Sequence, residues 1–324
     1  MSAQNVSIKG ITPGDENHRI SLNMSSQKDF GKLKASFTAR YTQGKYDINA
    51  GGSFGNGRDY IPYWNLINTP IQIPITEFRD WRNDKFSNPN YYFNDYYYNP
   101  YWTVDNFRQV GRSDDILGNV QLDYKMTNWL SFTYRLGATV SSASSKATQG
   151  AFVYNAFVKA SGKSNAVDLN AAVQDQSLTQ NRINSELFGT AQKDFGKFNF
   201  KLLLGHSFRE TNSKSLAASS NNLGIPEVFN LSVRKGEPTV GEGSSQARLQ
   251  RFFGSFGIGF NKWLFGEVTG SYDTDSRLYN PYNDDSKISF FYPGASLSIV
   301  LTDAIPFLKD NRKTFSAFLT YLFQ

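Results

Sequence analysis

The stretch Ile116–Lys125 reads ILGNVQLDYK and alternates strictly between two kinds of side chain. Its even-numbered positions are isoleucine, glycine, valine, leucine and tyrosine, and its odd-numbered positions are leucine, asparagine, glutamine, aspartate and lysine. Successive side chains of a β-strand point to opposite faces, so a period of two places each set on its own face. The stretch therefore predicts a strand with one apolar face and one polar face.

The same alternation recurs along the chain. Leu130–Ser141 repeats it with leucine, phenylalanine, tyrosine, leucine, alanine and valine on one face. Further strands are predicted at Leu33–Thr42, Phe198–Arg209, Phe252–Phe260, Leu264–Asp273 and Ala295–Leu301, with weaker ones at Ile20–Ser25, Ile183–Gln192 and Phe315–Phe323. These make about ten strands, many close to the roughly 9–11 residues of a tilted transmembrane strand.

The composition excludes several other classes of protein. The 324 residues include no cysteine, which excludes zinc fingers, disulfide scaffolds and a cysteine nucleophile. No run approaches the ~18 apolar residues of a transmembrane helix. An aromatic content of 15% argues against disorder. The two histidines, His18 and His206, are far apart, so a histidine metal cluster or a histidine-based triad is not expected.

The predicted connections alternate between short and long. The short ones are 27–32, 125–128, 193–197, 261–262 and 309–313, and the long ones are 44–113, 144–179, 211–245 and 275–287. Outer-membrane barrels show this asymmetry, with short periplasmic turns and longer extracellular loops, whereas a soluble sandwich gives no reason for it. The sequence therefore predicts an all-β fold, namely part of an antiparallel up-and-down transmembrane β-barrel with its polar faces toward a wet lumen.

The tight-turn end has its own chemistry. The hexapeptide QKDFGK occurs at 27–32 and again at 192–197, and its glycine permits a positive φ. Four aromatic residues lie at or beside this end: Phe30, Trp129, Phe195 and Trp263. They suggest an aromatic girdle at a membrane interface, and the alternative is a set of core aromatics capping a soluble sheet. Four glycines are expected on the apolar faces, where they relieve crowding: Gly118, Gly254, Gly266 and Gly270.

The candidate ligand site is an aromatic segment, Tyr91–Trp102, inside the longest loop. Exposed aromatic rings stack on sugar rings, and tyrosine offers a large contact area at low entropic cost. The candidate ligand-binding residues are Tyr91, Tyr92, Tyr96, Tyr97, Tyr98, Tyr101 and Trp102. The alternative is an aromatic mini-core that holds the loop together, and Tyr60, Trp64 and Trp81 fit either role.

No other pattern indicates chemistry. Acidic groups at Asp114–Asp115, Asp273–Asp275 and Asn283–Asp285 could bind calcium, but solvation at loop ends is the simpler interpretation. The glycine-rich stretches at 51–57 and 254–259 lack phosphate-binding spacing, and no hydrolase or kinase signature occurs. We therefore expect no catalytic residue, no cofactor and no metal. The net charge of +6 arises from scattered cations, so nucleic acid is not an expected partner.

Two motifs carry a family resemblance. The first is NPYW at Asn99–Trp102, followed by GRSDDILGNV at Gly111–Val120 and by Lys125, Thr127, Trp129 and Leu130 in the order YKxTxWL. The second is FYPGASLS at Phe291–Ser298, followed by LTDA. With these motifs the chain resembles the SusC/RagA-type TonB-linked outer-membrane receptors of Bacteroidetes, and Arg19–Tyr41 is similar to an early barrel hairpin of that family.

The resemblance implies a receptor in the cell outer membrane that imports oligosaccharides or peptides without catalysis. It implies a plugged barrel of roughly 22 strands. The implied partners are a SusD-like surface lipoprotein as a lid, the TonB complex, and outer-membrane lipid. No stretch of residues 1–324 resembles the family's signal peptide, plug, TonB box or remaining strands. The resemblance therefore predicts one partial barrel domain, whose TonB contacts would lie outside it and whose open edges need partners.

Two other functions stay open from the residues alone. One is a soluble or surface β-rich carbohydrate-binding protein that uses the tyrosine-rich loop as a lectin-like site. The other is an envelope hydrolase, because a pair of catalytic carboxylates leaves no signature in a single sequence.

Overall fold

The computed structural model describes residues 1–50, 60–282, 287–304 and 318–323. In these residues eleven strands form one sheet in chain order, and every neighbouring pair is antiparallel. The strands are β1 Ser2–Lys9, β2 Glu16–Phe30, β3 Leu33–Asn49, β4 Phe107–Lys125, β5 Leu130–Gln149, β6 Ala172–Phe195, β7 Phe198–Ser220, β8 Thr239–Phe260, β9 Leu264–Asp275, β10 Ser289–Val300 and β11 Phe318–Phe323. The predicted up-and-down meander is thus confirmed.

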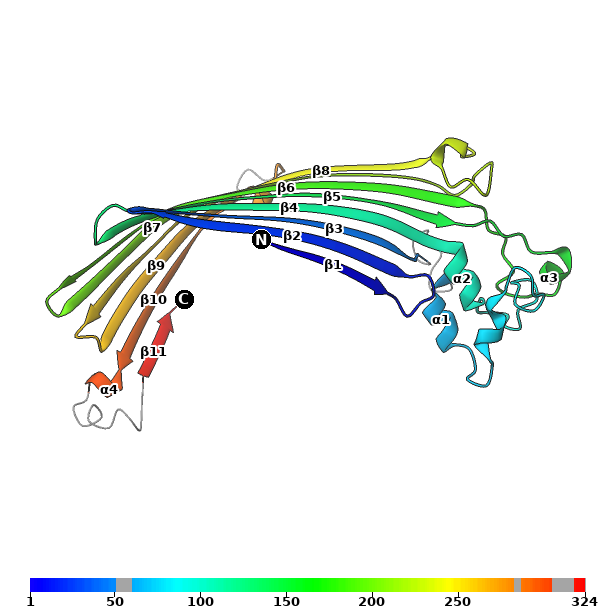
Figure 1. Cartoon of the computed structure of the whole chain (residues 1–324), viewed down its shortest axis with the longest axis horizontal. Coiled ribbons are helices and arrows are strands. Elements are labelled where there is room, and N and C mark those ends of the chain that lie inside the picture. The colour runs from blue at the N-terminus through cyan, green and yellow to red at the C-terminus, as the bar shows by residue number, and fades with distance from the viewer. Residues whose placement is uncertain (51–59, 283–286, 305–317, 324) are drawn as a thin grey trace.

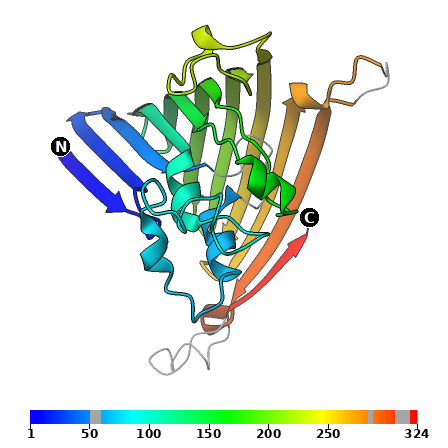
Figure 2. The same cartoon turned by 90° about the vertical axis from the view of Figure 1, so that its right-hand side faces the viewer.

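Short helices lie outside the sheet. They are α1 Pro62–Ile67, η2 Ile75–Arg79, α2 Pro100–Asn106, α3 Ala156–Ala160, η3 Leu231–Val233, η4 Ser276–Leu278 and α4 Leu301–Ala304. Among the described residues, no helix is both long enough and apolar enough to cross a membrane. Figure 2 shows β1 and β11 at opposite edges of the curved sheet, so the sheet is an open sector.

The strands are longer than the alternation predicted. β4 to β8 contain 19 to 24 residues each, and the predicted stretches occupy only the half of each strand next to the tight turns. The other halves carry mainly polar or small residues on both faces, with only isolated apolar ones such as Val110 and Leu216, so a hydrophobic period of two is absent although the ladder pairing continues. The predicted loops 44–113, 144–179 and 211–245 therefore shrink to the connections 50–106, 150–171 and 221–238.

The first strand was not predicted. β1 pairs with β2 over its whole length, with Val6 opposite Arg19, but it is too polar to show alternation. At the other end, β11 confirms the later part of the predicted strand 315–323, whereas 315–317 and the predicted turn 309–313 lie outside the described residues. The glycine-rich stretch 51–57 and the acidic group 283–285 also lie outside the described residues.

The tight turns confirm the predicted role of glycine. Gly31 and Gly196 have φ values of 79° and 59°, a region that side chains with a Cβ rarely adopt. The β8–β9 turn instead uses Asn261 and Lys262 at φ values of 49° and 64°. Two consecutive positive φ values match a type I′ turn, whose twist suits the flanking antiparallel strands.

The register places the two residue sets on opposite faces of the sheet. Phe37, Val120 and Leu136 lie side by side on one face, whereas their sequence neighbours on the other face are mainly polar. Phe107 belongs to the polar face of β4, and it packs against the loops that Figure 1 shows on the concave side of the arch. The polar face is therefore concave and the apolar face is convex.

We call the convex apolar residues the belt. They lie within the stretches 33–41, 116–124, 132–140, 183–191, 200–208, 252–260, 264–272 and 291–299. The predicted glycines at 118, 254, 266 and 270 lie on this face, as expected. Large belt side chains are exposed, with Leu204 at 60% and Phe291 at 63%. Monomeric soluble proteins rarely expose a contiguous apolar surface of this kind.

Candidate functional site

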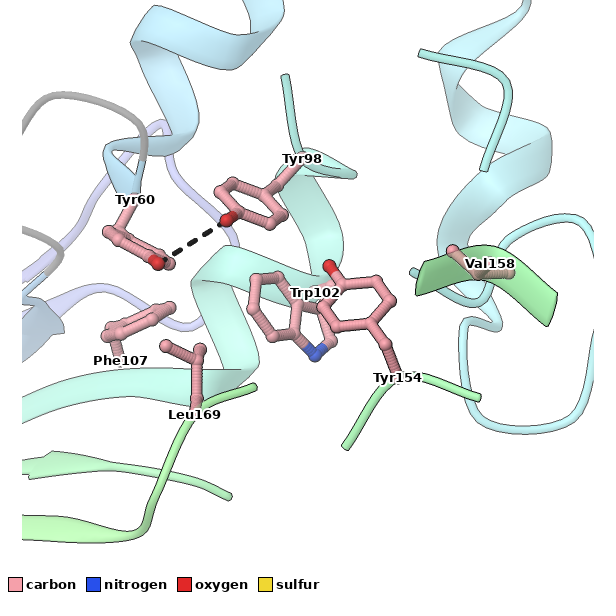
Figure 3. Close-up of a cluster of buried hydrophobic side chains, with 7 residues drawn as sticks. All are labelled: Tyr60, Tyr98, Trp102, Phe107, Tyr154, Val158 and Leu169. Carbon is pink, nitrogen blue, oxygen red and sulfur yellow. Dashed lines mark hydrogen bonds between the residues drawn. The ribbon is translucent and has the colours of Figure 1, made fainter. Parts of the chain in front are cut away.

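The loop cluster, which we define as residues 60–106 and 150–171, sits at the end of the sheet opposite the tight turns (Figures 1 and 2). Its core surrounds Trp102 of α2, whose side chain is completely buried. The Trp102 ring lies 5.1 Å from Tyr98 and 5.7 Å from Phe107, centroid to centroid. Figure 3 shows these rings with Tyr154 and Leu169, so two loops distant in sequence share one core.

The NPYW motif shapes this core. Asn99 caps α2, because its side-chain oxygen accepts a hydrogen bond from the backbone N–H of Tyr101. The Asn99 amide also donates to the carbonyl oxygens of Phe78 and Ser87, at 2.7 and 2.8 Å. Pro100 follows at the first helical position, where its missing N–H costs nothing. The motif thereby fixes the start of α2 and turns Trp102 inward.

Three of the seven candidate ligand residues are buried: Tyr98 and Trp102 lie in this core, and Tyr92 packs beside it against Phe78 and Phe93. Tyr92, Tyr98 and Trp102 are 3%, 5% and 0% exposed. Tyr98 stacks on Tyr60 at 5.0 Å, and their hydroxyl oxygens lie 3.3 Å apart (Figure 3). In this conformation the three rings have no free face for a ligand, so the mini-core interpretation holds for them. Tyr60 shares the role, and Trp81 packs against the core while donating from Nε1 to Asp105.

The other four candidates retain exposed surface. Tyr91 and Tyr96 are 38% and 71% exposed, and Tyr97 is half-buried. Tyr91 accepts a hydrogen bond from the Asn155 amide at 3.0 Å, which orients its ring. Tyr101 is half-buried and lines a pocket of about 790 Å³ together with Arg79, Arg82 and Arg108. These four remain the candidate ligand residues of the loop cluster.

Arg108 of β4 ties the β1–β2 connection to the loop end of the sheet. Its guanidinium contacts Asp15 at 2.9 Å and Asp47 at 2.6 Å, and donates to the carbonyl oxygen of Gly14 at 2.8 Å. It therefore joins the β1–β2 connection, β3 and β4 through one side chain. Sequence reasoning missed this link because its partners are separated from Arg108 by 61 to 94 positions.

Several ionisable groups of the loop cluster have shifted pKa values. Burial raises the pKa of Tyr92 to about 12, and burial also raises the pKa of Tyr154. The Asp168 carboxylate has a lowered pKa, because Lys159 and the backbone N–H of Tyr154 both donate to it. None of these groups is suited to exchange protons at pH 7, so they have structural roles.

A third loop covers the convex face near the same end. Leu223 packs with Val173 of β6, and Phe229, Leu231 and Val233 lie against them. This segment appears above β8 in Figure 1, opposite the loop cluster. Lys146 of β5 anchors it by donating to the carbonyl oxygen of Phe229 at 3.3 Å. The loop end of β6 is therefore buried on both faces, at Ala172 and Val173.

The concave face is a hydrogen-bonded polar wall. Side chains on adjacent strands pair laterally, as in Arg40 to Asn23 at 2.7 Å and Thr133 to Asp123 at 2.8 Å. A wall pocket of about 500 Å³ lies between β4 and β8. Its lining includes four arginines: Arg135, Arg182, Arg209 and Arg251. This arrangement suits water and charged solutes.

The acidic groups considered for calcium are held mostly by arginine. Asp114 accepts from Arg112, Tyr41 and Gln43, Asp273 from Arg251, and Asp275 from Arg277. Within the part of the chain that the structure describes, no group of three or more histidines and carboxylates is arranged to hold a metal ion.

No protein-family model and no curated protein sequence matches this chain. The structure is similar to one described as the RagAB peptide transporter, with a TM-score of 0.66 and 13% identity over 90% of this chain and 31% of that chain. It is also similar to the RagAB peptide importer in its "open-open" state, with a TM-score of 0.63 and 14% identity over 90% and 30% of the two chains.

A more distant likeness is to BauA, the ferric preacinetobactin receptor from Acinetobacter baumannii, with a TM-score of 0.51 and 9% identity over 91% of this chain and 39% of that chain. The chain spans about a third of the length of the RagAB chain that it matches. At these identities the likeness concerns the fold. It confirms the fold implied by the SusC/RagA resemblance, a sector of a β-barrel wall.

Proposed function

We propose that this chain forms part of the wall of a TonB-dependent import barrel of the SusC/RagA type in the cell outer membrane. The observation that carries the proposal is the inverted distribution of side chains, apolar on the convex face and polar on the concave face. A soluble sheet buries its apolar face against another layer, whereas a membrane barrel presents it to lipid. A soluble carbohydrate-binding protein would leave the belt uncovered.

The sidedness follows from the two ends of the sheet. Phe30, Trp129 and Phe195 are exposed beside the tight turns, in the position of an interfacial aromatic girdle. Short turns face the periplasm in outer-membrane barrels, and long loops face the exterior. We therefore assign the loop cluster to the extracellular side and the tight turns to the periplasmic side.

We propose a peptide as the cargo, with an oligosaccharide as the second candidate. The similar structures described as RagAB are a peptide transporter and a peptide importer, which supports this choice. Tyr91, Tyr96, Tyr97 and Tyr101 would contact cargo from the loop cluster, and the wall would pass it without catalysis. A SusD-like surface lipoprotein would close the extracellular side, and the TonB complex would act on a region beyond this chain.

Uptake in cells tests the proposal. A strain lacking the gene is compared with the parent strain for uptake of a fluorescent peptide pool and of a fluorescent oligosaccharide pool. We expect loss of peptide uptake and recovery of the protein in the outer-membrane fraction. Tyr96→Ala should reduce uptake, whereas Tyr63→Ala, which changes an exposed loop tyrosine of α1, should not. Loss of oligosaccharide uptake alone would identify an oligosaccharide as the cargo instead of a peptide. Recovery of the protein in the soluble fraction would refute the proposal.

A further inference from the structure

The wall pocket contains more positive charge than the wall itself neutralises. We propose that Arg182 and Arg209 form a binding site for a carboxylate group of a polypeptide on the concave face. The inference rests on the proposed import function for its cargo, an acidic peptide, but the site can be measured without transport.

The two arginines lie on adjacent strands of the same face. In the β6–β7 register Arg182 is opposite Thr211 and Arg209 is opposite Asn184, so the two arginines are diagonal neighbours. Diagonal positions in an antiparallel pair are within reach of long side chains. Both residues are exposed and line the same pocket of about 500 Å³, so their guanidinium groups can converge on one anion.

The neighbouring arginines of the wall, Arg135 and Arg251, are each paired with a carboxylate. Arg135 contacts Glu186 at 3.1 Å, and Arg251 makes two hydrogen bonds to Asp273. Arg209 instead donates from Nε to the neutral oxygen of Asn184 at 2.8 Å. Among the described residues, neither Arg182 nor Arg209 has a carboxylate within ion-pair distance. The pocket therefore keeps two positive charges in excess.

The unpaired charges favour a carboxylate as the ligand. A guanidinium presents a planar fork of N–H groups that matches the two oxygens of a carboxylate, and an anion also relieves the repulsion between the two cations. The surroundings favour a peptide as its carrier, because Asn119 and Asn184 place side-chain amides beside the pair. Such amides can bond to a peptide backbone as donors and acceptors.

A glycine keeps the floor of the pocket open. Gly137 lies opposite Asn119 and Asn184 in the strand between them, and a Cβ there would lie 2.7 Å from Asn119 Oδ1. Asn119 leans over this glycine toward Asn184, which brings the two amides to one place. The volume suits a few residues of an extended chain and excludes a folded domain.

Fluorescence anisotropy tests the site in the full 324-residue chain in detergent micelles. The probe is fluorescein-labelled hexaglutamate, with hexaglutamine as the uncharged peptide. We expect hexaglutamate to bind, hexaglutamine to bind much more weakly, and Arg182→Gln with Arg209→Gln to weaken hexaglutamate binding by about tenfold or more. Lys193→Gln with Lys197→Gln removes the same charge at the tight-turn end and should leave binding unchanged.

A lysine variant and a folding control keep the result interpretable. Arg182→Lys with Arg209→Lys retains the charge but loses the planar forks, so an intermediate loss of affinity is expected. The β content by circular dichroism should be the same in all variants, since both arginines are exposed. The proposal would be overturned if Arg182→Gln with Arg209→Gln bound hexaglutamate as well as Lys193→Gln with Lys197→Gln does. It would also be overturned if the folded parent chain did not bind hexaglutamate.

Uptake by cells then identifies the source of the carboxylate. Imported peptide as the source predicts that the double glutamine variant loses uptake of hexaglutamate but not of hexaglutamine. An acidic segment elsewhere in the same receptor predicts that both uptakes change together. The parent strain could take up no peptide while binding in micelles still depends on the two arginines. That result would support the binding site and refute the import function.

Discussion

The hydrophobic residues of the loop cluster are buried within this chain, whereas those of the belt are exposed on its surface. In the loop cluster Trp102 and Tyr154 are enclosed by side chains of the same chain, whereas Leu204 in the belt is 60% exposed. Every buried hydrophobic side chain of the described residues lies in a loop or near the loop end of a strand. The belt therefore depends on its surroundings for burial, and the loop cluster depends on its own packing.

This difference changes what a substitution should do. A cavity in the loop cluster loses contacts that nothing else replaces. Lipid can fill the space left by a shortened side chain in the belt. Only a polar or charged substitution should therefore lower the free energy of unfolding there by a large amount.

Trp102→Ala should destabilise the loop cluster by about 3–5 kcal/mol, because it removes a fully buried indole from between Tyr98 and Phe107. Proteolysis of residues 60–106 across a urea series measures the local stability. Tyr63→Ala, at an exposed position of α1, is the control and should have little effect. Equal protease resistance of Trp102→Ala and the parent chain would mean that the aromatic core does not hold the loops.

Leu204→Arg should cost about 2–4 kcal/mol of folding free energy in lipid vesicles, the range for a cation on the lipid face of a barrel. Leu203→Arg is the matched control, because the adjacent leucine points to the polar concave face. The unfolding transition in urea, followed by the heat-dependent mobility of the protein in gels, compares the two variants. If Leu203→Arg is the more damaging change, the two faces have been assigned the wrong way round.

Asn99→Ala should destabilise the loop cluster by about 1–3 kcal/mol, since it removes the cap of α2 and leaves the carbonyl oxygens of Phe78 and Ser87 without their donor. Asn99→Asp is informative beside it, because a carboxylate keeps the cap to the Tyr101 N–H but cannot donate. The same proteolysis assay should rank the parent chain above both variants. Full stability of Asn99→Asp would assign the effect to the cap alone.

Gly196→Ala should cost about 1–2 kcal/mol, because a Cβ is strained at a φ of 59°. Gly118→Ala provides the comparison in the belt, where a Cβ would meet no atom within 4 Å. Urea midpoints of the whole sheet in vesicles measure both changes. A larger loss at Gly118 than at Gly196 would show that the belt is more tightly packed than its exposure indicates.

Acid should loosen the loop cluster before the belt. The pKa of Asp168 is lowered in the folded chain by the hydrogen bonds from Lys159 and from the Tyr154 N–H. Its contribution to stability is present above the unfolded value of about 3.9 and disappears as the pH falls through the lower folded value. Protease resistance of residues 150–171 measured from pH 5 downward should fall in that window. Asp168→Asn should abolish this pH dependence, and an unchanged profile would refute the assignment.

The sequence was sufficient for the belt because alternation is a local property. Ile116–Lys125 and Leu130–Ser141 both fall within strands whose faces match the prediction. The same signal is absent from the loop halves of the strands, such as Ser142–Ser145 in β5, where small polar residues occupy both faces. The pairing there is specified by the continuing ladder, so the predicted loops were too long.

The loop cluster was predictable only in part. The sequence identified the NPYW motif through the family resemblance, and the structure shows that its asparagine, Asn99, caps α2. Whether each aromatic ring is buried depends on contacts between distant segments, as in the packing of Leu169 near Trp102, and no local pattern encodes them. The Arg108 ion pairs and the two wall arginines without a carboxylate partner have the same origin, because the register of the sheet brings residues distant in sequence together.

In the proposed membrane arrangement, the convex face of the sheet contacts lipid and the concave face contacts water. Because the chain contains no cysteine, single cysteines can be placed at each position from 116 to 124 and labelled with a nitroxide in lipid vesicles. Even-numbered positions should be accessible to oxygen dissolved in lipid, and odd-numbered positions should be accessible to a water-soluble nickel complex. Uniform accessibility to the nickel complex along the whole stretch would contradict this arrangement.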